Sequence, residues 1–252
     1  MKHPLLASVI LFGLGQAVPV AAADITLIAP GGIRAAITQM IPDFEKQTGH
    51  KVKAEFGSGG GTHDRVVKGE AFDVPVVQPP YQDVIASGNV DAKTETPLAT
   101  VWVAVAVKKG APKPDISTPE AVKRMLLQAK SISYPNAASG AAAGVSFNET
   151  LQKLGIAQEM KPKIKVAQGG AGAMALLAKG EVDIGLTFLS EIVDPGVDVV
   201  GPLPAAISTP TSLVAFVSSH AKDRAAAEAL LRYLSSPAAG KIYKEGGMVP
   251  GR

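Results

Sequence analysis

Residues 55–65 have the sequence Glu-Phe-Gly-Ser-Gly-Gly-Gly-Thr-His-Asp-Arg, and the rest of the chain can be organised around them. They follow an alternating run, 51–56, that predicts a β-strand, and they lead into a helical pattern that starts at Arg65. Glycines in such a turn let the backbone approach a ligand, and the N-terminus of the next helix favours a negative group. We predict that this loop forms one wall of an anion-binding cleft. The alternative is a plain turn between a strand and a helix.

The same order of strand, glycine-containing loop and helix recurs along the chain. The first unit places Gly31-Gly32 between a strand and a helix at 33–47. The second half repeats the arrangement with turns at 136–140 and 169–172. This alternation predicts an α/β fold with mostly parallel sheets flanked by helices. Ligands of such sheets bind at the carboxyl ends of the strands, so we expect the four loops to share one site.

Two apolar segments predict that the chain is divided between two lobes. Residues 98–107 form a long apolar run, which we expect to be a buried strand that crosses from one lobe to the other. The strand expected at 212–218 brings the chain back to the first lobe. We therefore predict lobe I from residues 24–104 plus 206–252 and lobe II from 105–205, with the ligand cleft between them. Two hinged lobes are a common arrangement for trapping a small solute.

Residues 1–23 have the pattern of a secretory signal peptide. Lys2 is followed by an apolar segment, 5–20, and by three alanines that fit a cleavage site before Asp24. The apolar segment is short and interrupted, so we predict no stable membrane insertion of the mature chain. We expect a monomeric protein in the periplasm, without a lipid anchor because the cleavage site has no cysteine.

Composition excludes several classes of function. The chain has no cysteine, which rules out disulfides, a thiolate nucleophile and Cys-based metal sites. The histidines are scattered, and we predict neither a metal site nor a cofactor. A net charge of +3, spread along a chain with few aromatic residues, argues against a nucleic-acid partner. Residues 170–175 imitate a dinucleotide fingerprint with Glu191 near the expected distance, but an exported protein rarely meets soluble NAD.

Several segments together resemble the periplasmic solute-binding proteins of ABC importers, close to the molybdate-binding branch. The segments that carry the resemblance are 43–52, 56–58, 69–74, 173–185 and 233–238. The resemblance covers essentially the whole mature chain. It implies a type II periplasmic-binding fold, a small anionic ligand and an ABC transporter permease as a partner.

The resemblance also implies how the ligand is held. In that branch, hydroxyls and backbone N–H groups from four helix-start loops, together with a tyrosine, hold a tetrahedral oxyanion without counter-charges. Carried over to this sequence, with two cationic residues added, the predicted ligand-binding residues are Gly31, Gly32, Arg34, Ser58, Gly59, Gly60, Thr62, His63, Ser139, Gly140, Gly170 and Ala171.

This sequence departs from the pattern of the branch. Glycine replaces the usual serine in the first loop, Phe188 stands at the tyrosine position, and His63 and Arg34 add cationic groups. Losing neutral donors and gaining cations suits a carboxylate, onto which Arg34 could place two hydrogen bonds. We predict capture of a small anion, either an organic carboxylate or a molybdate-like oxyanion. The alternatives without a role in binding are that His63 and Arg34 are surface residues and that Ser139 caps a helix.

A second hypothesis concerns catalysis. The periplasmic aconitate isomerases resemble the same binding proteins but move a proton between carbons of a tricarboxylic acid. Under this alternative the protein interconverts cis- and trans-aconitate. His63 is then the candidate general base, since the pKa of histidine lies near the working pH.

Overall fold

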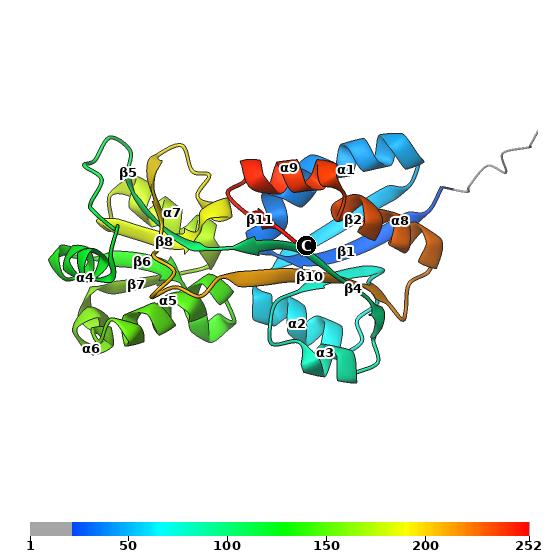
Figure 1. The fold of residues 1–252 in the computed structure, drawn as a ribbon, viewed down its shortest axis with the longest axis horizontal. Coiled ribbons are helices and arrows are strands. Elements are labelled where there is room, and N and C mark those ends of the chain that lie inside the picture. Colours follow the sequence, from blue (N-terminus) through cyan, green and yellow to red (C-terminus); the bar gives the residue numbers. More distant parts are fainter. Residues whose placement is uncertain (1–21, 252) are drawn as a thin grey trace, which may run out of the picture.

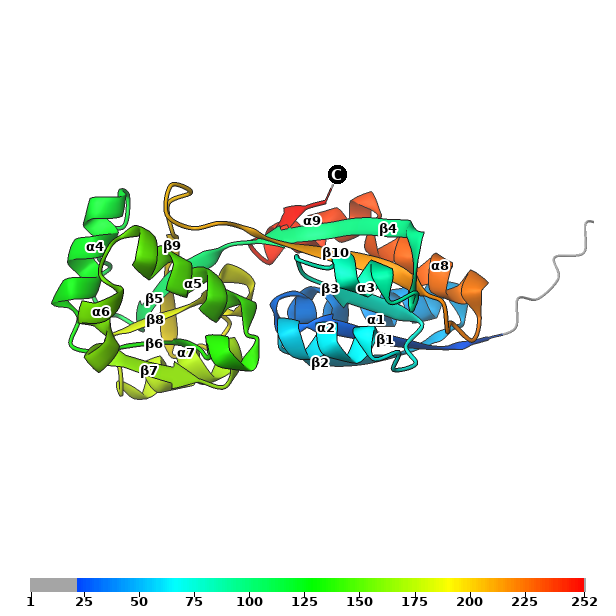
Figure 2. The same ribbon diagram turned by 90° about the horizontal axis from the view of Figure 1, so that it is seen from below.

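The computed structural model describes residues 22–251 and has two lobes, each built on one β-sheet covered by helices (Figures 1 and 2). The first sheet has the strand order β11-β4-β10-β3-β1-β2 and the second has the order β7-β6-β8-β5-β9. The predicted two-lobe α/β fold is confirmed. The predicted signal peptide lies almost entirely outside the described residues. None of the helices in 22–251 is long and apolar enough to cross a membrane.

The first lobe contains both ends of the described chain. Its strands are β1 (Asp24–Pro30), β2 (Lys51–Gly57), β3 (Val74–Val77), β4 (Val90–Val101), β10 (Thr211–Ser218) and β11 (Val249–Pro250). Its helices are η1 (Gly31–Ile33), α1 (Arg34–Thr48), α2 (Gly59–Val67), α3 (Gln82–Ala86), α8 (Arg224–Leu234) and α9 (Pro237–Glu245). Helices α1, α8 and α9 cover one face of the sheet, and α2 and α3 cover the other (Figure 1).

The second lobe is formed by the middle of the chain. Its strands are β5 (Val103–Lys108), β6 (Ile132–Pro135), β7 (Ile164–Ala167), β8 (Ile184–Phe188) and β9 (Val197–Pro202). Its helices are α4 (Pro119–Gln128), η2 (Ala137–Ser139), α5 (Ala142–Lys153), α6 (Ala157–Met160), η3 (Lys161–Lys163), α7 (Gly169–Lys179) and η4 (Leu189–Glu191).

Both sheets are mixed rather than mostly parallel. The strands followed by the glycine loops pair in parallel: β1 with β2 and β3, and β6 with β7 and β8. The strands near the lobe crossings pair antiparallel, as β10 does with β3 and β4, and β5 with β8 and β9. A strand that arrives from the other lobe needs no helical crossover within its own sheet, so antiparallel pairing is open to it.

The chain passes between the lobes twice. The single strand expected at 98–107 is divided at Trp102, so that β4 belongs to the first sheet and β5 to the second. The return runs from the end of β9 to the start of β10 (Figures 1 and 2). Side chains of α5 hold this return segment, since the hydroxyl of Thr150 donates to the carbonyl of Ile207 at 2.9 Å.

The helices acquire their places by burying one apolar stripe. In α1, the side chains of Ala36, Ile37, Met40 and Phe44 are all buried, at the spacing of one helical face. Burying a large apolar side chain of this kind stabilises the fold by roughly 1.5–3 kcal/mol. Gly49 ends α1 with φ +77°, as its place after the helical pattern predicts.

Helix α2 begins earlier than the sequence pattern predicts. It starts at Gly59, immediately after Ser58, and not at Arg65, so the glycines form its first turn. Space explains their presence there. A Cβ atom on Gly59 would lie 2.0 Å from Oε1 of Gln78, and one on Gly60 would lie 2.9 Å from Cα of Gly140. The opening motif is therefore a helix start pressed against neighbouring segments.

Candidate functional site

A cavity of about 510 Å³ between the lobes brings the four predicted loops together. We call it the loop cavity. Its walls come from the ends of β1, β2, β6, β7 and β8 and from the helices that follow them. The residues on its walls include Gly31, Gly32, Arg34, Ser58, Gly59, Gln78, Ser139, Ala142, Gln168, Gly170, Ala171, Phe188, Ser190 and Glu191. Within the described chain, Arg34 and Glu191 are the only ionisable residues on its walls.

The helices that start at the loop cavity lack side-chain caps in three of four cases. Within residues 22–251, no side chain caps η1, which continues into α1, and the same holds for α5 and α7. The N-cap residues there are Pro30, Ala141 and Gln168. The N-terminal turn of a helix presents N–H groups and a partial positive charge. The loop cavity is therefore edged by helix ends suited to a negative group.

The fourth helix start closes the gap between the lobes. The hydroxyl of Ser58 caps α2 by accepting the N–H of Gly61 at 3.0 Å. The N–H of Gly60 donates across the cleft to the carbonyl of Gly140 at 2.9 Å. The hydroxyl of Ser190 makes a second bridge by donating to the carbonyl of Gly32 at 2.6 Å. The lobes are thus in direct contact on either side of the loop cavity.

Glu191 places a carboxyl group on the cavity wall. Its Oε2 accepts a hydrogen bond from the hydroxyl of Thr187, which is buried in β8. Two glycines make room for it, because a Cβ atom on Gly31 would lie 2.9 Å from Oε1 and one on Gly170 would lie 2.5 Å from Oε2. Burial raises the pKa of Glu191, against the opposing effects of Thr187 and of the charge on Arg34.

Gln78 is the second polar residue that the sequence analysis did not identify. It directly follows β3, and its side chain is buried. Neither its amide nitrogen nor its amide oxygen has a hydrogen-bond partner among the described residues. A buried amide without partners is unfavourable unless a ligand or water satisfies it. Because Gln78 lines the loop cavity, we assign its amide as a candidate ligand contact.

Arg34 lies at the rim of the loop cavity. Its guanidinium stands over the ring of Phe56, 4.8 Å from the centroid, and donates to the carbonyl of the same residue at 3.4 Å. The side chain is exposed, so its charge is available to the cavity and to solvent. Phe188, in contrast, is buried and contributes an apolar patch to the wall.

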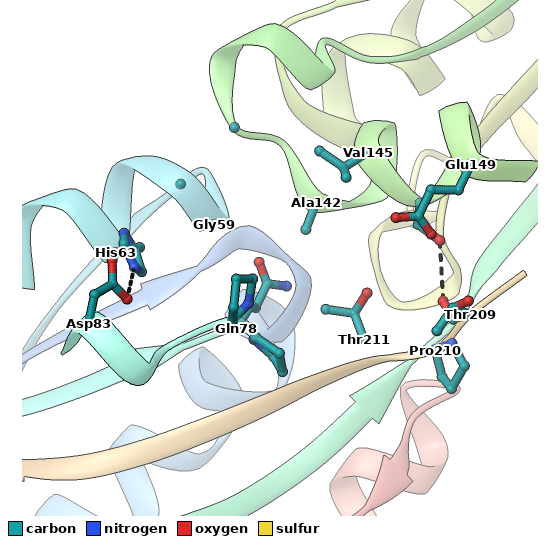
Figure 3. Close-up of a pocket in the computed structure, with 15 residues that line it drawn as sticks. Gly59, His63, Gln78, Asp83, Ala142, Val145, Glu149, Thr209, Pro210 and Thr211 are labelled. Carbon is teal, nitrogen blue, oxygen red and sulfur yellow. Dashed lines mark hydrogen bonds and ion pairs between the residues drawn. The ribbon is translucent and has the colours of Figure 1, made fainter. Parts of the chain in front are cut away.

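His63 lies in a neighbouring cavity of about 460 Å³, which we call the side cavity (Figure 3). Its Nε2 lies 2.9 Å from Oδ1 of Asp83, and its Nδ1 lies 3.3 Å from Oδ1 of Asp64. Burial lowers the pKa of His63, but its hydrogen bonds with Asp83 and Asp64 outweigh this, and the net shift is upward. His63 is thus suited to carry a positive charge, and both nitrogens are engaged.

The two cavities adjoin each other. Gly59, Gln78 and Ala142 line both and form the partition between them. Figure 3 shows Gln78 and Ala142 between the His63–Asp83 pair and Glu149 on the opposite side. The hydroxyl of Ser146 donates to the carbonyl of Thr209 at 3.2 Å beside Glu149.

The structure distributes the predicted residues in three ways. Those that line the loop cavity are Gly31, Gly32, Arg34, Ser58, Gly59, Ser139, Gly170 and Ala171. Those that line the side cavity are Gly59, Gly60, His63 and Gly140. Thr62 is buried and is absent from both sets of wall residues in the described chain. Ser139 does not cap α5, since its hydroxyl donates to the carbonyl of Asn136 at 2.8 Å.

The residues that the sequence analysis missed differ in how visible they were. Gln78 is a polar residue at the carboxyl end of a buried strand, which is a position typical of ligand contacts in α/β sheets. Glu191 carries no comparable local signal. Its role depends on Gly31, which is 160 positions away in the sequence, and on Gly170, which is 21 positions away. No group of three or more potential metal ligands occurs within residues 22–251.

Comparison with known proteins places the chain in a family. The family model described as "Bacterial extracellular solute-binding protein" matches residues 25–249. The chain is 33% identical over 234 residues to the aconitate isomerase of a Pseudomonas species, with 90% of this chain and 87% of that protein covered. It is 28% identical over 255 residues to the molybdate-binding protein ModA of Azotobacter vinelandii, with 98% of each covered.

Solved structures agree with the fold. The periplasmic molybdate-binding protein of Azotobacter vinelandii superposes with a TM-score of 0.76 at 21% sequence identity, covering 90% of this chain and all of that one. The sulfate-binding protein SubI of Mycobacterium tuberculosis gives a TM-score of 0.72 at 18% identity, covering 90% of this chain and 87% of the other. From the family match and the relatives together, the chain belongs to the bacterial extracellular solute-binding proteins.

Proposed function

We propose that this protein captures a small organic polycarboxylate in the loop cavity. The observation that carries the proposal is the convergence of three uncapped helix starts, at Pro30, Ala141 and Gln168, on one cavity with Arg34 at its rim. Backbone N–H groups and one guanidinium bind carboxylate oxygens with charge-assisted hydrogen bonds. The relatives that carry the names molybdate-binding protein and aconitate isomerase support an anionic ligand.

Two features favour a polycarboxylate over a tetrahedral oxyanion. The side cavity adjoins the loop cavity across Gln78, so a longer molecule could reach both if that side chain moved aside. There the imidazole of His63, whose pKa is raised, could exchange one of its aspartate partners for a second carboxylate of the ligand.

Closure of the lobes would retain the ligand. The bond from Gly60 to Gly140 and the bond from Ser190 to Gly32 both join one lobe to the other, so opening the cleft must break them. A hinged, two-lobe division at the crossings supports such a movement. We propose that the closed monomer acts in the periplasm and delivers its ligand to the permease of an ABC importer.

A ligand panel tests the proposal. Citrate, cis-aconitate, trans-aconitate and succinate are compared with molybdate, sulfate and phosphate by thermal shift and isothermal titration calorimetry. We expect stabilisation by the tricarboxylates, and roughly tenfold weaker binding in Arg34→Gln, since one charge-assisted contact contributes about 1.5–3 kcal/mol. The matched control is Arg124→Gln, an exposed arginine on α4. Stabilisation by tetrahedral oxyanions alone would contradict the proposal.

A second candidate function is the isomerisation of aconitate. The 33% identity to an aconitate isomerase is the observation that favours it. In this reaction a proton leaves one carbon, the double bond shifts, and a proton returns at the other end, so no atoms are gained or lost. The predicted base, His63, has both ring nitrogens engaged by carboxylates. Glu191 is the carboxyl on the loop cavity and is a second candidate to carry the proton.

An interconversion assay separates the two functions. Purified protein is incubated with cis- and with trans-aconitate, and the isomers are followed by chromatography. Conversion by the wild type with loss in His63→Ala supports His63 as the base, whereas loss in Glu191→Gln alone supports Glu191. Binding in the calorimeter without any conversion excludes the isomerase and leaves the solute-binding proposal intact.

A further inference from the structure

Glu191 is a carboxyl group in a cavity otherwise suited to anions. It belongs to η4 in the second lobe, and its oxygens fill the space beside Gly31 of the first lobe and Gly170 of the second. It therefore stands where two of the four helix-start loops meet. A side chain at either glycine would collide with it. The sequence thus keeps a negative or proton-bearing group at the point where the loops would otherwise present only donors.

We propose that Glu191 is a ligand-contacting residue that couples ligand capture to the uptake of one proton. The inference rests on the proposed function, because it takes the ligand to be an anion in the loop cavity. Bound beside Glu191, the anion favours the protonated carboxyl, which then donates a hydrogen bond to a ligand oxygen. The proton comes from solvent and stays on Glu191, so no bond of the ligand is broken.

The physical basis is the repulsion between two negative groups in one cavity. A neighbouring like charge raises the pKa of a carboxyl, so the bound anion moves the pKa of Glu191 above its value in the free protein. Burial already raises that pKa in the free protein. By linkage, the affinity must then fall as pH rises between the two pKa values, by at most about tenfold per pH unit.

The charged groups around Glu191 do not remove this coupling. Arg34, at the cavity rim, acts in the opposite direction but is exposed to solvent. Asp194, in the following loop, is engaged by the N–H of Gly196. On the strands packed against η4, the charged residues are Lys108 of β5 and Asp198 of β9, and both lie toward the strand ends remote from Phe188.

The coupling would make binding depend on pH for any ionised ligand. A carboxyl group that binds its ligand only after taking up a proton weakens the binding of carboxylates and oxyanions alike as pH rises. An uncharged amide at the same position would accept such an ion at any pH. Glutamine at 191 should therefore abolish the coupling and flatten the pH dependence of the affinity.

Proton uptake is measured directly by titration calorimetry in buffers of different ionisation enthalpy. Trans-aconitate is the probe, at pH 6.5, 7.5 and 8.5, where it is essentially ionised. We expect the wild type to take up a larger fraction of a proton than Glu191→Gln at one or more of these values. We also expect the affinity of the variant for trans-aconitate to change less with pH than that of the wild type.

Two further variants keep the test decisive. Glu159→Gln changes an exposed acid on α6 and should retain the wild-type uptake. Thr187→Val removes the donor that stabilises the ionised Glu191, so the uptake should peak at higher pH. Any proton that His63 takes up on binding is the same in the wild type and in Glu191→Gln, so it does not affect the difference in proton uptake between them. Equal uptake in wild type and Glu191→Gln would overturn the inference, whereas absence of binding in both would overturn the proposed function instead.

Discussion

The helix starts at the loop cavity and those of the longer helices elsewhere on the molecule are built differently. Away from the cavity, α4, α8 and α9 are each capped by a side chain, whereas the short helices α3 and α6 have no such cap among the described residues. The acceptors are the side-chain oxygens of Thr118, Asp223 and Ser236, which receive N–H groups at 3.2, 3.0 and 3.2 Å. At the cavity, within the described residues, η1, α5 and α7 have no such cap. The sequence has proline, alanine and glutamine where the capped helices have hydroxyl or carboxylate groups.

The difference in capping distinguishes helix starts that contribute to stability from helix starts that are available for binding. A side-chain cap stabilises a helix by about 0.5–2 kcal/mol, and the cavity helices forgo this contribution. Their N–H groups stay available for a ligand, which would supply the missing acceptors only when it is bound. The same trade-off explains why a side-chain cap occurs at Ser58, on the helix whose Gly60 contacts the other lobe.

The largest expected effect comes from preventing contact between the lobes. In Gly60→Val, the new side chain would begin 2.9 Å from Cα of Gly140 and would keep the cleft open. We expect affinity for the best-binding carboxylate to fall by about 100-fold or more, because the ligand loses the contacts of one lobe. Calorimetry measures the affinity, and small-angle scattering should show a more open molecule. Gly172→Ala is the control, since its Cβ would make an ordinary contact of 3.4 Å.

Adding a cap at the cavity should exchange binding for stability. Gln168→Asp places a carboxylate at the N-cap of α7, where the backbone is extended as caps require. We expect the free energy of unfolding to rise by about 1 kcal/mol and the anion affinity to fall about tenfold, because the new group competes for the same N–H donors and repels the ligand. Denaturant unfolding and calorimetry on the same preparation measure both. Unchanged affinity would show that α7 does not contact the ligand.

Removing a cap away from the cavity should affect stability alone. Thr118→Ala deletes the acceptor for the N–H of Ala121 at the start of α4. We expect a loss of about 1 kcal/mol in the free energy of unfolding and no change in affinity. Chemical denaturation and calorimetry provide the readouts. A large fall in affinity would mean that α4 is coupled to the cavity. That result would contradict the expected separation between capped helices that serve stability and uncapped helices that serve binding.

The smallest effect concerns the pH dependence of the His63–Asp83 pair. Because the folded-state pKa of His63 is raised, its contribution to stability is fully present below its unfolded pKa, about 6.5, and is lost as pH rises through the folded value. Asp83 is largely exposed, so solvent screening keeps the contribution of the pair to stability small. The difference in Tm between wild type and His63→Gln should shrink between pH 6 and 8. A difference that grows with pH would contradict the assigned direction.

The sequence predicted the architecture well and the site unevenly. The alternation of strands and glycine loops predicts the α/β lobes, and the loops at 31–32, 58–60, 137–140 and 169–171 do contribute to the two adjoining cavities. His63 and Arg34, however, line different cavities, because the first turn of α2 turns His63 toward Asp83. Gln78 and Glu191 were not predicted as site residues. Their positions depend on long-range packing that no local pattern encodes.

The sequence by itself determined where helices could start, because glycine runs after apolar strands, and the types of residue that precede them, are local features. Only the tertiary structure decided what those starts face. The approach of Gly60 to Gly140 joins residues 80 positions apart, and that of Gly31 to Glu191 joins residues 160 positions apart, whereas Gly170 is 21 positions from Glu191. Glycine in each case is explained by a neighbour that the folded chain brings within 3 Å. Steric exclusion at Gly60 and Gly31 exists only after the two lobes have packed together, and at Gly170 only after the second lobe has folded.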